Sequence, residues 1–165
     1  ITKAIRAVDK NHIIFIEGNQ FANDFSGLTP PWDNNMAYSF HKYWNPTTFE
    51  TINKFAKIRD DFNVPLWMGE SGENDNTWYK AAVSLLESNN IGWCWWTIKK
   101  VGSESGIMDV EMPDGYQGII DYWAGKSTRP SAEMARTVFM QLAENTKLQN
   151  CRINYGVLKA LFSIN

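Results

Sequence analysis

Apolar positions recur along this chain in two alternating patterns. In residues 1–9 they are spaced as on one face of a helix, and this segment ends at Lys10 and Asn11. Short continuous apolar runs appear further along, and such runs between turn-forming residues are typical of strands buried on both faces. We predict strands at residues 13–16, 36–44, 65–69 and 91–99.

Amphipathic segments follow the later strands. One runs from a capping stretch at residues 45–47 to residue 63, one from residue 76 to residue 90, and one opens at Pro130. A long irregular connection joins the first two strands, and the tail is expected to end in a smaller helix. This alternation predicts a parallel sheet wrapped by helices, with right-handed crossovers and no linker that divides two domains.

The ends of the predicted strands carry side chains that are suited to chemistry. They are Glu17 in "IEGN", His41 and Tyr43 in "SFHKYW", Glu70 in "GESGEN", and Trp95 and Trp96 in "WCWWTIK". In parallel α/β folds the loops after the strands converge at one edge, so neighbouring strands would bring these side chains together. A carboxylate can attack an anomeric carbon, a phenol or imidazole can orient it, and an indole face can carry a sugar ring. The set therefore indicates sugar chemistry.

The composition narrows the possible partners. The 16 basic and 18 acidic residues give a net charge of −2 without a basic stripe, which argues against nucleic acid. No apolar stretch approaches the roughly 20 residues of a membrane-spanning helix, so we expect a soluble chain and no membrane partner. Eight tryptophans are unusual in 165 residues, and on loops such rings offer flat faces to ligands. Trp32, in the long connection, is a candidate for stacking on sugar, with anchoring of the loop as the alternative.

The histidines and cysteines do not indicate a metal site. The only partner for His41 would be His12, which precedes the first predicted strand and would lie at the opposite end of the sheet. Cys94 lies inside an apolar run and is expected to be a small buried side chain. No metal is therefore expected.

Four motifs resemble one enzyme family. The stretches "HIIFIEGN", "PPWDNNMAYSFHKYW", "VPLWMGESGEN" and "GWCWWTIK" are similar, in order and spacing, to the C-terminal half of family 5 glycoside hydrolases, which are cellulase-like retaining enzymes. The resemblance covers residues 1–145. It implies an α/β fold that is half of a (β/α)8 TIM barrel, strands five to eight with their helices. Residues 146–165 would form a C-terminal helical tail packed on this barrel.

The resemblance also implies roles for individual residues. Glu70 matches the catalytic nucleophile at the end of strand seven. His41 and Tyr43 match the residues after strand six that touch the substrate and hold the nucleophile, and Trp96 matches the sugar platform after strand eight. We therefore expect Glu70, His41 and Tyr43 to be catalytic, Trp96 and Trp32 to bind substrate, and no cofactor to be needed.

One part of the family pattern is missing. In the family the acid/base glutamate stands in an Asn-Glu-Pro motif after strand four, and this sequence contains no Asn-Glu-Pro. The chain opens within the helix that would follow that strand, so we expect a fragment or processed product. A retaining mechanism needs two carboxyl groups, and Glu70 supplies one. Glu17 could be imagined as the other, but it lacks the motif, and strand-end polar residues often only bond loop backbone.

The expected function is hydrolysis of O-glycosidic bonds in β-glucans, with this chain carrying the nucleophile half. Open sheet edges and an apolar face disfavour a solitary monomer, so an N-terminal half-barrel chain or a second copy in a homodimer would complete it. A polymeric substrate implies a secreted or periplasmic enzyme. The alternative is a catalytically incomplete sugar-binding or structural half-barrel. A nucleotide-binding doubly wound protein is less favoured, because no Gly-rich phosphate loop follows any strand.

Overall fold

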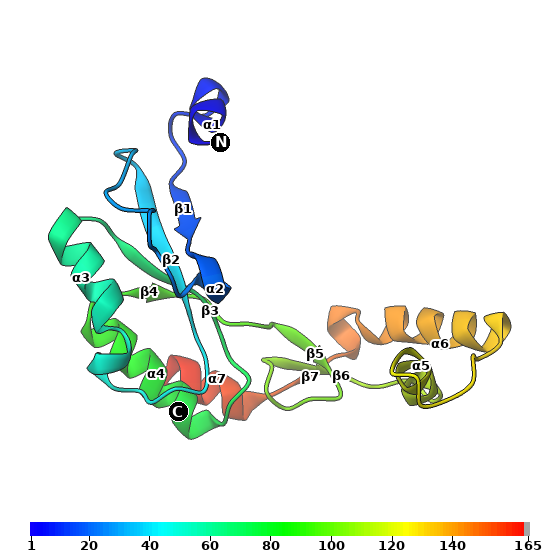
Figure 1. Cartoon of the computed structure of the whole chain (residues 1–165). Coiled ribbons are helices and arrows are strands. Elements are labelled where there is room, and N and C mark those ends of the chain that lie inside the picture. Colours follow the sequence, from blue (N-terminus) through cyan, green and yellow to red (C-terminus); the bar gives the residue numbers. More distant parts are fainter. Residues whose placement is uncertain (164–165) are drawn as a thin grey trace. The chain divides into compact units, whose positions relative to one another are not determined.

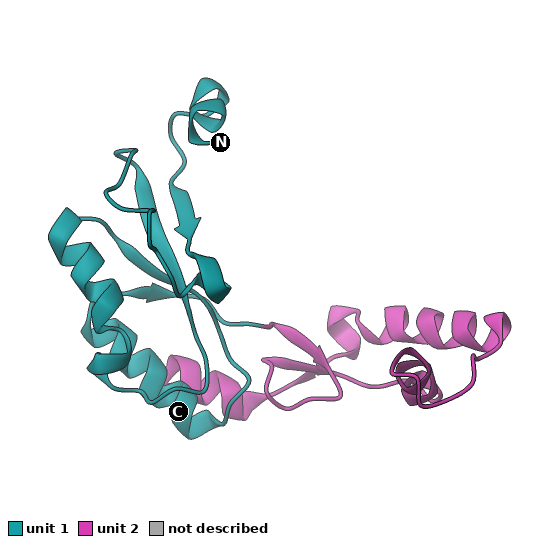
Figure 2. Cartoon of the chain, in the orientation of Figure 1, with its two compact units in different colours: residues 1–96 teal, residues 97–165 magenta. Residues whose placement is uncertain are grey.

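The chain forms two compact units. The computed structural model describes residues 1–163, and the first unit comprises residues 1–96 while the second begins at residue 97 (Figure 2). This division does not coincide with the boundary expected at residue 145. The assignment of residues 1–145 to a catalytic barrel and of residues 146–165 to a tail remains a prediction.

A four-stranded parallel sheet forms the centre of the first unit (Figure 1). Its strands lie side by side in chain order, which confirms the predicted parallel α/β alternation. The strands are β1 (Ile14–Glu17), β2 (Met36–Lys42), β3 (Leu66–Ser71) and β4 (Gly92–Trp93). The helices are α1 (Thr2–Val8), α2 (Asn19–Ala22), the 3-10 turn η1 (Phe49–Thr51), α3 (Asn53–Phe62) and α4 (Asn76–Ser88).

Local signals set the ends of these elements. The Asp75 carboxylate accepts a hydrogen bond of 2.8 Å from the backbone N–H of Trp78 and so caps the start of α4. Asn63 closes α3 in the left-handed conformation, with φ of 51°. The strand predicted at residues 36–44 ends earlier, at Lys42, because Trp44 has a positive φ that a strand cannot continue.

The two faces of the sheet differ in burial. On one face Tyr38, Phe40 and Met68 are fully buried, and the ring of Phe40 stacks on Phe55 of α3 with centroids 4.2 Å apart. This face and the helices that cover it form the core of the unit. On the other face Phe15 remains 50% exposed beside Trp67. The first unit therefore leaves one apolar sheet face open.

The prediction of a long fourth strand at residues 91–99 is wrong. The strand β4 has only two residues, and its extension leaves the ladder because Trp95 turns into the core against Tyr79, with ring centroids 4.9 Å apart. The chain after it forms a small mixed sheet in the second unit, with order β5 (Lys99–Val101), β6 (Met108–Val110) and β7 (Arg152–Ile153).

The second unit is otherwise helical. It contains α5 (Tyr116–Trp123), α6 (Ala132–Asn145), the 3-10 turn η2 (Leu148–Asn150) and α7 (Tyr155–Phe162). Ser131 caps α6 by accepting from the Met134 backbone, close to the start predicted from Pro130. The final helix α7 confirms the smaller helix expected in the tail.

Candidate active site

A β-bulge decides where the Glu70 side chain points. The register between β2 and β3 shifts after Phe40, which pairs with Met68, so that His41 pairs with Glu70 and Gly69 is the extra residue. Without the bulge, alternation would place Glu70 on the same face as Met68, in the core. The extra residue turns the carboxylate to the open face instead. The strand thus continues through Glu70 to Ser71, two residues beyond its predicted end at Gly69.

Gly69 has a steric reason to lack a side chain. A Cβ there would lie 2.2 Å from Ser39 Oγ and 3.3 Å from Glu17 Oε1. The bare backbone lets these two side chains approach the bulge. Side chains from two neighbouring strands, β1 and β2, therefore require a glycine at this position.

Tyr43 holds the Glu70 carboxylate. Its hydroxyl donates a hydrogen bond of 2.6 Å to Glu70 Oε1. Burial raises the pKa of Tyr43, and the hydrogen bond to Glu70 raises it further. The phenol therefore stays protonated at neutral pH and remains a donor to the carboxylate.

His41 lies between two carboxylates. Its Nε2 is 3.2 Å from Glu17 Oε1, and its Nδ1 is 3.9 Å from Glu70 Oε2. The Ser39 hydroxyl donates to the same Glu17 oxygen over 3.3 Å. The His41 side chain is only 13% exposed, so these contacts fix the ring against rotation. An ionised carboxylate can only accept, which assigns a proton to Nε2.

We predict that Glu17 orients the His41 ring. Replacing Glu17 with alanine removes the acceptor of Nε2–H, so this proton should exchange faster with water and its imidazole NMR signal should broaden or disappear. The measurement is a long-range ¹H–¹⁵N spectrum of the labelled chain, which is simple to read because the sequence has two histidines.

The chain offers two controls for that experiment. His12 is exposed and pairs with Asp9 over 2.5 Å, so its signals should not change in the Glu17 variant. Glu111→Ala, an exposed glutamate in the second unit, provides a matched loss of one carboxylate. An unchanged His41 signal in Glu17→Ala would show that Glu17 does not orient the ring.

The backbone of Trp96 is hydrogen-bonded to β3, the strand that carries Glu70. Its backbone N–H donates to the Ser71 carbonyl over 2.7 Å. A Cβ at Gly72 would lie 2.0 Å from the Trp96 carbonyl oxygen, so glycine is required for this close approach. The Trp96 ring remains 54% exposed, whereas Trp95 is buried. The two neighbouring rings therefore differ in exposure, and the ring of Trp96 is the one open to a ligand.

These side chains share one pocket. Its volume is about 560 Å³, which is in the usual range for small-ligand sites. Exposed aromatic rings stand around the carboxylate, and Trp44 is held by a hydrogen bond of 2.8 Å from its Nε1 to the Glu73 carbonyl. The lining residues are Phe21, Asn23, His41, Tyr43, Trp44, Asn45, Glu70, Glu73 and Trp96.

The structure does not bring Trp32 to this pocket. Its indole Nε1 donates to Thr2 Oγ1 over 2.8 Å, and the neighbouring Asp33 pairs with Arg6 over 2.8 Å. Trp32 therefore connects the long loop to α1, in line with the loop-anchoring alternative. The expectation for Cys94 is wrong: the residue is exposed, because it lies where the sheet face is open, and its Sγ contacts the Gly69 carbonyl at 2.7 Å.

Sequence reasoning missed two aromatic residues of the pocket. Trp44 was included only as the end of a strand, and Phe21 was not singled out. A tryptophan directly after a "HKY" strand end and a phenylalanine among Asn, Gln and Asp residues are the signals that could have found them.

Within residues 1–163 no cluster of three or more His, Cys, Asp and Glu side chains is arranged to hold a metal ion. None of the helices in that range combines the length and apolar character needed to cross a membrane.

Several solved structures are similar to this chain. The cellulose synthase subunit Z of Clostridioides difficile superposes with a TM-score of 0.56 at 18% identity, covering 97% of this chain and 52% of that chain. Cel5A of Thermotoga maritima, solved with mannotriose, gives 0.60 at 16% identity, covering 98% and 51%. The same enzyme with cellobiose gives 0.61 at 16% identity, with the same coverage. At such identities the similarity shows the fold, and this chain spans about half of the length of these structures.

A comparison with curated proteins found no match. The family model described as "Cellulase (glycosyl hydrolase family 5)" matches residues 1–102. This range contains the whole parallel sheet and every residue that lines the pocket around Glu70. Because the match covers more than half of the chain, the protein belongs to glycosyl hydrolase family 5.

Proposed function

We propose that this chain is the nucleophile half of a retaining glycoside hydrolase that cleaves β-glucans. The observation that carries the proposal is the Glu70 carboxylate, aimed by a bulge into a pocket, held by Tyr43 and flanked by the exposed ring of Trp96. On this proposal β1 to β4 are the fifth to eighth strands of a (β/α)8 barrel. Their carboxyl ends form the mouth where barrel enzymes place their chemistry.

The proposed first step is attack of a Glu70 oxygen on the anomeric carbon of the sugar. A bond forms between them while the bond to the leaving oxygen breaks, and an acid supplies the proton that this oxygen needs. Tyr43 and His41 hold the carboxylate and contact sugar hydroxyls, and Trp96 supports the ring. In the second step the group that gave the proton takes one from water, the water oxygen bonds to the anomeric carbon, and the bond to Glu70 breaks, which restores the carboxylate and the acid. No cofactor takes part.

The second carboxyl group is proposed to come from outside this chain. In retaining enzymes it lies about 5–5.5 Å from the nucleophile. An N-terminal half-barrel would supply it, or a second copy would cover the open surface in a homodimer. The half-exposed Phe15 on the open sheet face supports such an association. So does β1, which is an edge strand with free pairing positions.

The substrate and location are part of the same proposal. Among the similar structures, one of Cel5A is described with cellobiose and another with mannotriose, so mannan is the competing polymer to test. We propose a β-glucan because the motifs resemble cellulases. Polymers of this kind are degraded outside the cytoplasm, and we therefore propose a secreted or periplasmic enzyme.

The proposal is tested by native mass spectrometry combined with turnover of an aryl β-cellobioside. The chain alone should be inactive, and a complex with an N-terminal half-barrel should hydrolyse the cellobioside unless Glu70 is replaced by alanine. Turnover by the monomeric chain would contradict the half-site. Saccharide binding without turnover in any complex would favour the alternative, a sugar-binding half-barrel. Its supporting observation is the group of exposed aromatic rings in the pocket.

Removal of the Tyr43 hydroxyl should slow the completed enzyme. Tyr43→Phe keeps the ring but removes the donor to Glu70, and hydrogen bonds to charged groups are worth about 1.5–3 kcal/mol. We expect kcat to fall about 10- to 100-fold. Steady-state kinetics on the aryl β-cellobioside measures this, with Tyr122→Phe, in α5 outside the pocket, as the matched control. A kcat equal to that of the wild type would contradict a role for Tyr43 in holding the nucleophile.

A further inference from the structure

A buried lysine lies directly before the residues that line the pocket around Glu70. Lys42 is the last residue of β2, and it is 2% exposed. The three residues that follow it, at positions 43–45, all line the pocket. Lysine is seldom fully buried unless its ammonium has partners, because an unpaired charge is costly inside a protein. The partners of Lys42 therefore indicate what this side chain does.

The Lys42 ammonium holds the segment that follows β2. Its Nζ donates to Asn45 Oδ1 over 2.5 Å, to the Pro46 carbonyl over 2.8 Å and to Thr51 Oγ1 over 2.9 Å. An ammonium has three N–H donors, so each of them has an acceptor here. The Trp78 ring centroid lies 5.7 Å from Nζ, and the Trp78 Nε1 donates to the Asn45 carbonyl over 2.8 Å. Lys42 and Trp78 together bind this segment to η1 and α4.

The backbone of the segment is strained. Trp44 has a φ of 46°, a conformation that residues other than glycine adopt at an energetic cost. The Asn45 N–H donates to the Tyr43 carbonyl over 2.5 Å, so the chain turns tightly here. Such backbone persists only where the surrounding structure holds it. Lys42 holds it on one side, and the hydrogen bond from Trp44 to the Glu73 carbonyl holds it on the other.

Tyr43 depends on this segment for its contact with Glu70. Its ring centroid lies 5.2 Å from that of Trp44, and its hydroxyl meets Glu70 Oε1 at 2.6 Å. A hydrogen bond weakens steeply when its donor moves away from the ideal distance and angle. Because Tyr43 lies between Lys42 and the strained Trp44, a movement of the segment would displace the phenol from the carboxylate.

We propose that Lys42 is a positioning residue of this site: its three donors hold residues 43–46 in the conformation in which Tyr43 bonds to Glu70, and loss of one donor loosens that hold. The inference rests on the proposed function and adds to it a pH-sensitive contact outside the pocket. Lys42 acts on the reaction through Tyr43 and does not touch the substrate.

Deprotonation is the event that removes one donor. Burial lowers the pKa of Lys42 to about 8, and the neutral amine has two N–H donors. The Thr51 hydroxyl can donate to this amine only by giving up its bond of 2.7 Å to the Thr48 carbonyl, so one hydrogen bond is lost in either case. Burial, rather than a neighbouring charge, is the cause of the lowered pKa. The ionisable side chains on the surrounding segments are Tyr43, Glu50, Glu70, Asp75 and Tyr79.

The first test is an aromatic ¹H–¹³C NMR titration of the labelled chain through pH 8. In the wild type we expect the ring signals of Tyr43 and Trp44 to shift with a midpoint near pH 8. In Lys42→Met this step should be absent, because methionine fills the site without a proton to lose. Neither ring is among the hydrogen-bond partners of Nζ, so the shift reports movement of the segment.

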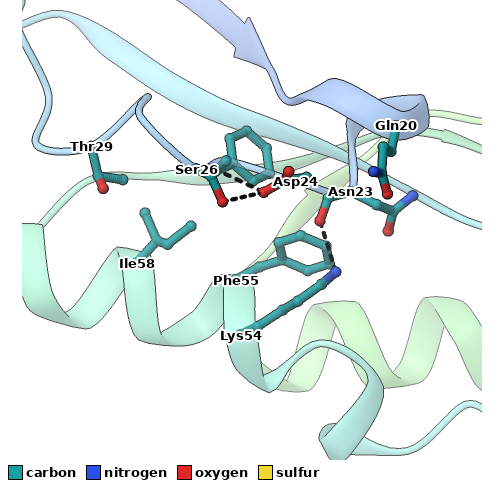
Figure 3. A pocket seen from close by; sticks show the side chains of 9 residues that line it. Gln20, Asn23, Asp24, Ser26, Thr29, Lys54, Phe55 and Ile58 are labelled. Carbon is teal, nitrogen blue, oxygen red and sulfur yellow. Dashed lines mark hydrogen bonds between the residues drawn. The ribbon is translucent and has the colours of Figure 1, made fainter.

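Lys54→Met is the matched control for this titration. Lys54 is exposed, and it donates one hydrogen bond of 2.7 Å to the Asn23 carbonyl. Figure 3 shows this lysine beside a second pocket of about 400 Å³, where it passes the ring of Phe55 and reaches toward Asn23. Its loss removes a lysine that binds a different loop, so the step of Tyr43 and Trp44 near pH 8 should remain. Absence of this step from the wild type, or its presence in Lys42→Met, would overturn the proposal.

Kinetics of the completed enzyme separate positioning from general stabilisation. Lys42→Met should lower kcat on the order of 10-fold at a temperature where urea unfolding shows it to be folded, because a small displacement near a nucleophile slows the chemical step. Added to Tyr43→Phe, the same substitution should change kcat less than about 2-fold, since the hydroxyl through which Lys42 acts is already gone.

The possible failures differ in their results. An unchanged kcat in Lys42→Met, or an equal loss with and without the Tyr43 hydroxyl, would overturn the positioning role and leave the proposed function standing. A completed enzyme without any turnover would overturn the proposed function. In that case the titration of the chain alone still decides whether Lys42 holds residues 43–46.

Discussion

Replacing Glu70 with glutamine is expected to lower kcat/KM of the completed enzyme on the order of 10³-fold or more, because Glu70 is the group that forms the glycosyl bond in the proposed mechanism. Glutamine has nearly the same shape and its carbonyl can still accept from Tyr43, so folding and binding should persist. The measurement is hydrolysis of an aryl β-cellobioside by the variant and the wild type in the same complex. Glu111→Gln, an exposed position in the second unit, is the matched control.

A second variant identifies the role of Glu70 more closely. In Glu70→Ala a small anion such as azide can occupy the vacated space and attack the anomeric carbon from the same side. The product should then be a glycosyl azide of inverted configuration, formed only in the variant. If Glu70→Gln retained turnover close to the wild type, Glu70 would not be the nucleophile, and its contacts with Tyr43 would only be structural.

Replacing Lys42 with alanine is expected to lower the free energy of unfolding by about 2–4 kcal/mol. The side chain is buried, and its Nζ donates to Asn45 Oδ1, the Pro46 carbonyl and Thr51 Oγ1 at 2.5, 2.8 and 2.9 Å. Alanine leaves a cavity and three acceptors without their donor. Urea unfolding followed by tryptophan fluorescence measures the loss. Lys80→Ala, an exposed lysine on α4, should change stability little.

The protonation of Lys42 should also make the free energy of unfolding depend on pH. Burial lowers the pKa of Lys42 to about 8, below its ordinary value of 10.5. Below pH 8 Lys42 is protonated in both the folded and the unfolded chain, so the folded chain bears the full free-energy cost of burying the charge. Between pH 8 and 10.5 Lys42 is protonated only in the unfolded chain. In this range its contribution therefore raises the free energy of unfolding as the pH rises.

Lys42→Met separates the charge from the packing. Methionine fills most of the cavity, so this variant should lose less stability than Lys42→Ala. It should also lose the rise in stability between pH 8 and 10.5, measured as the difference from the wild type. A wild-type chain and Lys42→Met with parallel pH profiles would show that the buried lysine does not titrate in this range.

The sequence predicted the architecture of the first unit well. Short apolar runs and the amphipathic segments between them identified all four strands and the helices that separate the last three. Parallel pairing then followed from the alternation alone. The fourth strand was too long in the prediction because an apolar run does not reveal where a ring such as Trp95 leaves the ladder for the core.

The candidate site was only partly predictable. Motif resemblance pointed to Glu70, Tyr43, His41 and Trp96, and the structure gathers all four in one pocket. The bulge at Gly69 could not be predicted, because it depends on side chains from two neighbouring strands. The position of Phe21 was equally hidden, since three successive left-handed residues without glycine have no sequence signature.

The most direct test of the account is intact mass spectrometry of this chain after incubation with dinitrophenyl 2-deoxy-2-fluoro-β-cellobioside. Dinitrophenolate leaves without a proton, so the bond to the nucleophile can form even where no acid is present. We expect the addition of one fluorocellobiosyl group, located on Glu70 by peptide mapping and absent from Glu70→Gln. A label on another residue, or a chain that stays unlabelled both alone and with its completing half, would contradict the assignment of Glu70 as the nucleophile.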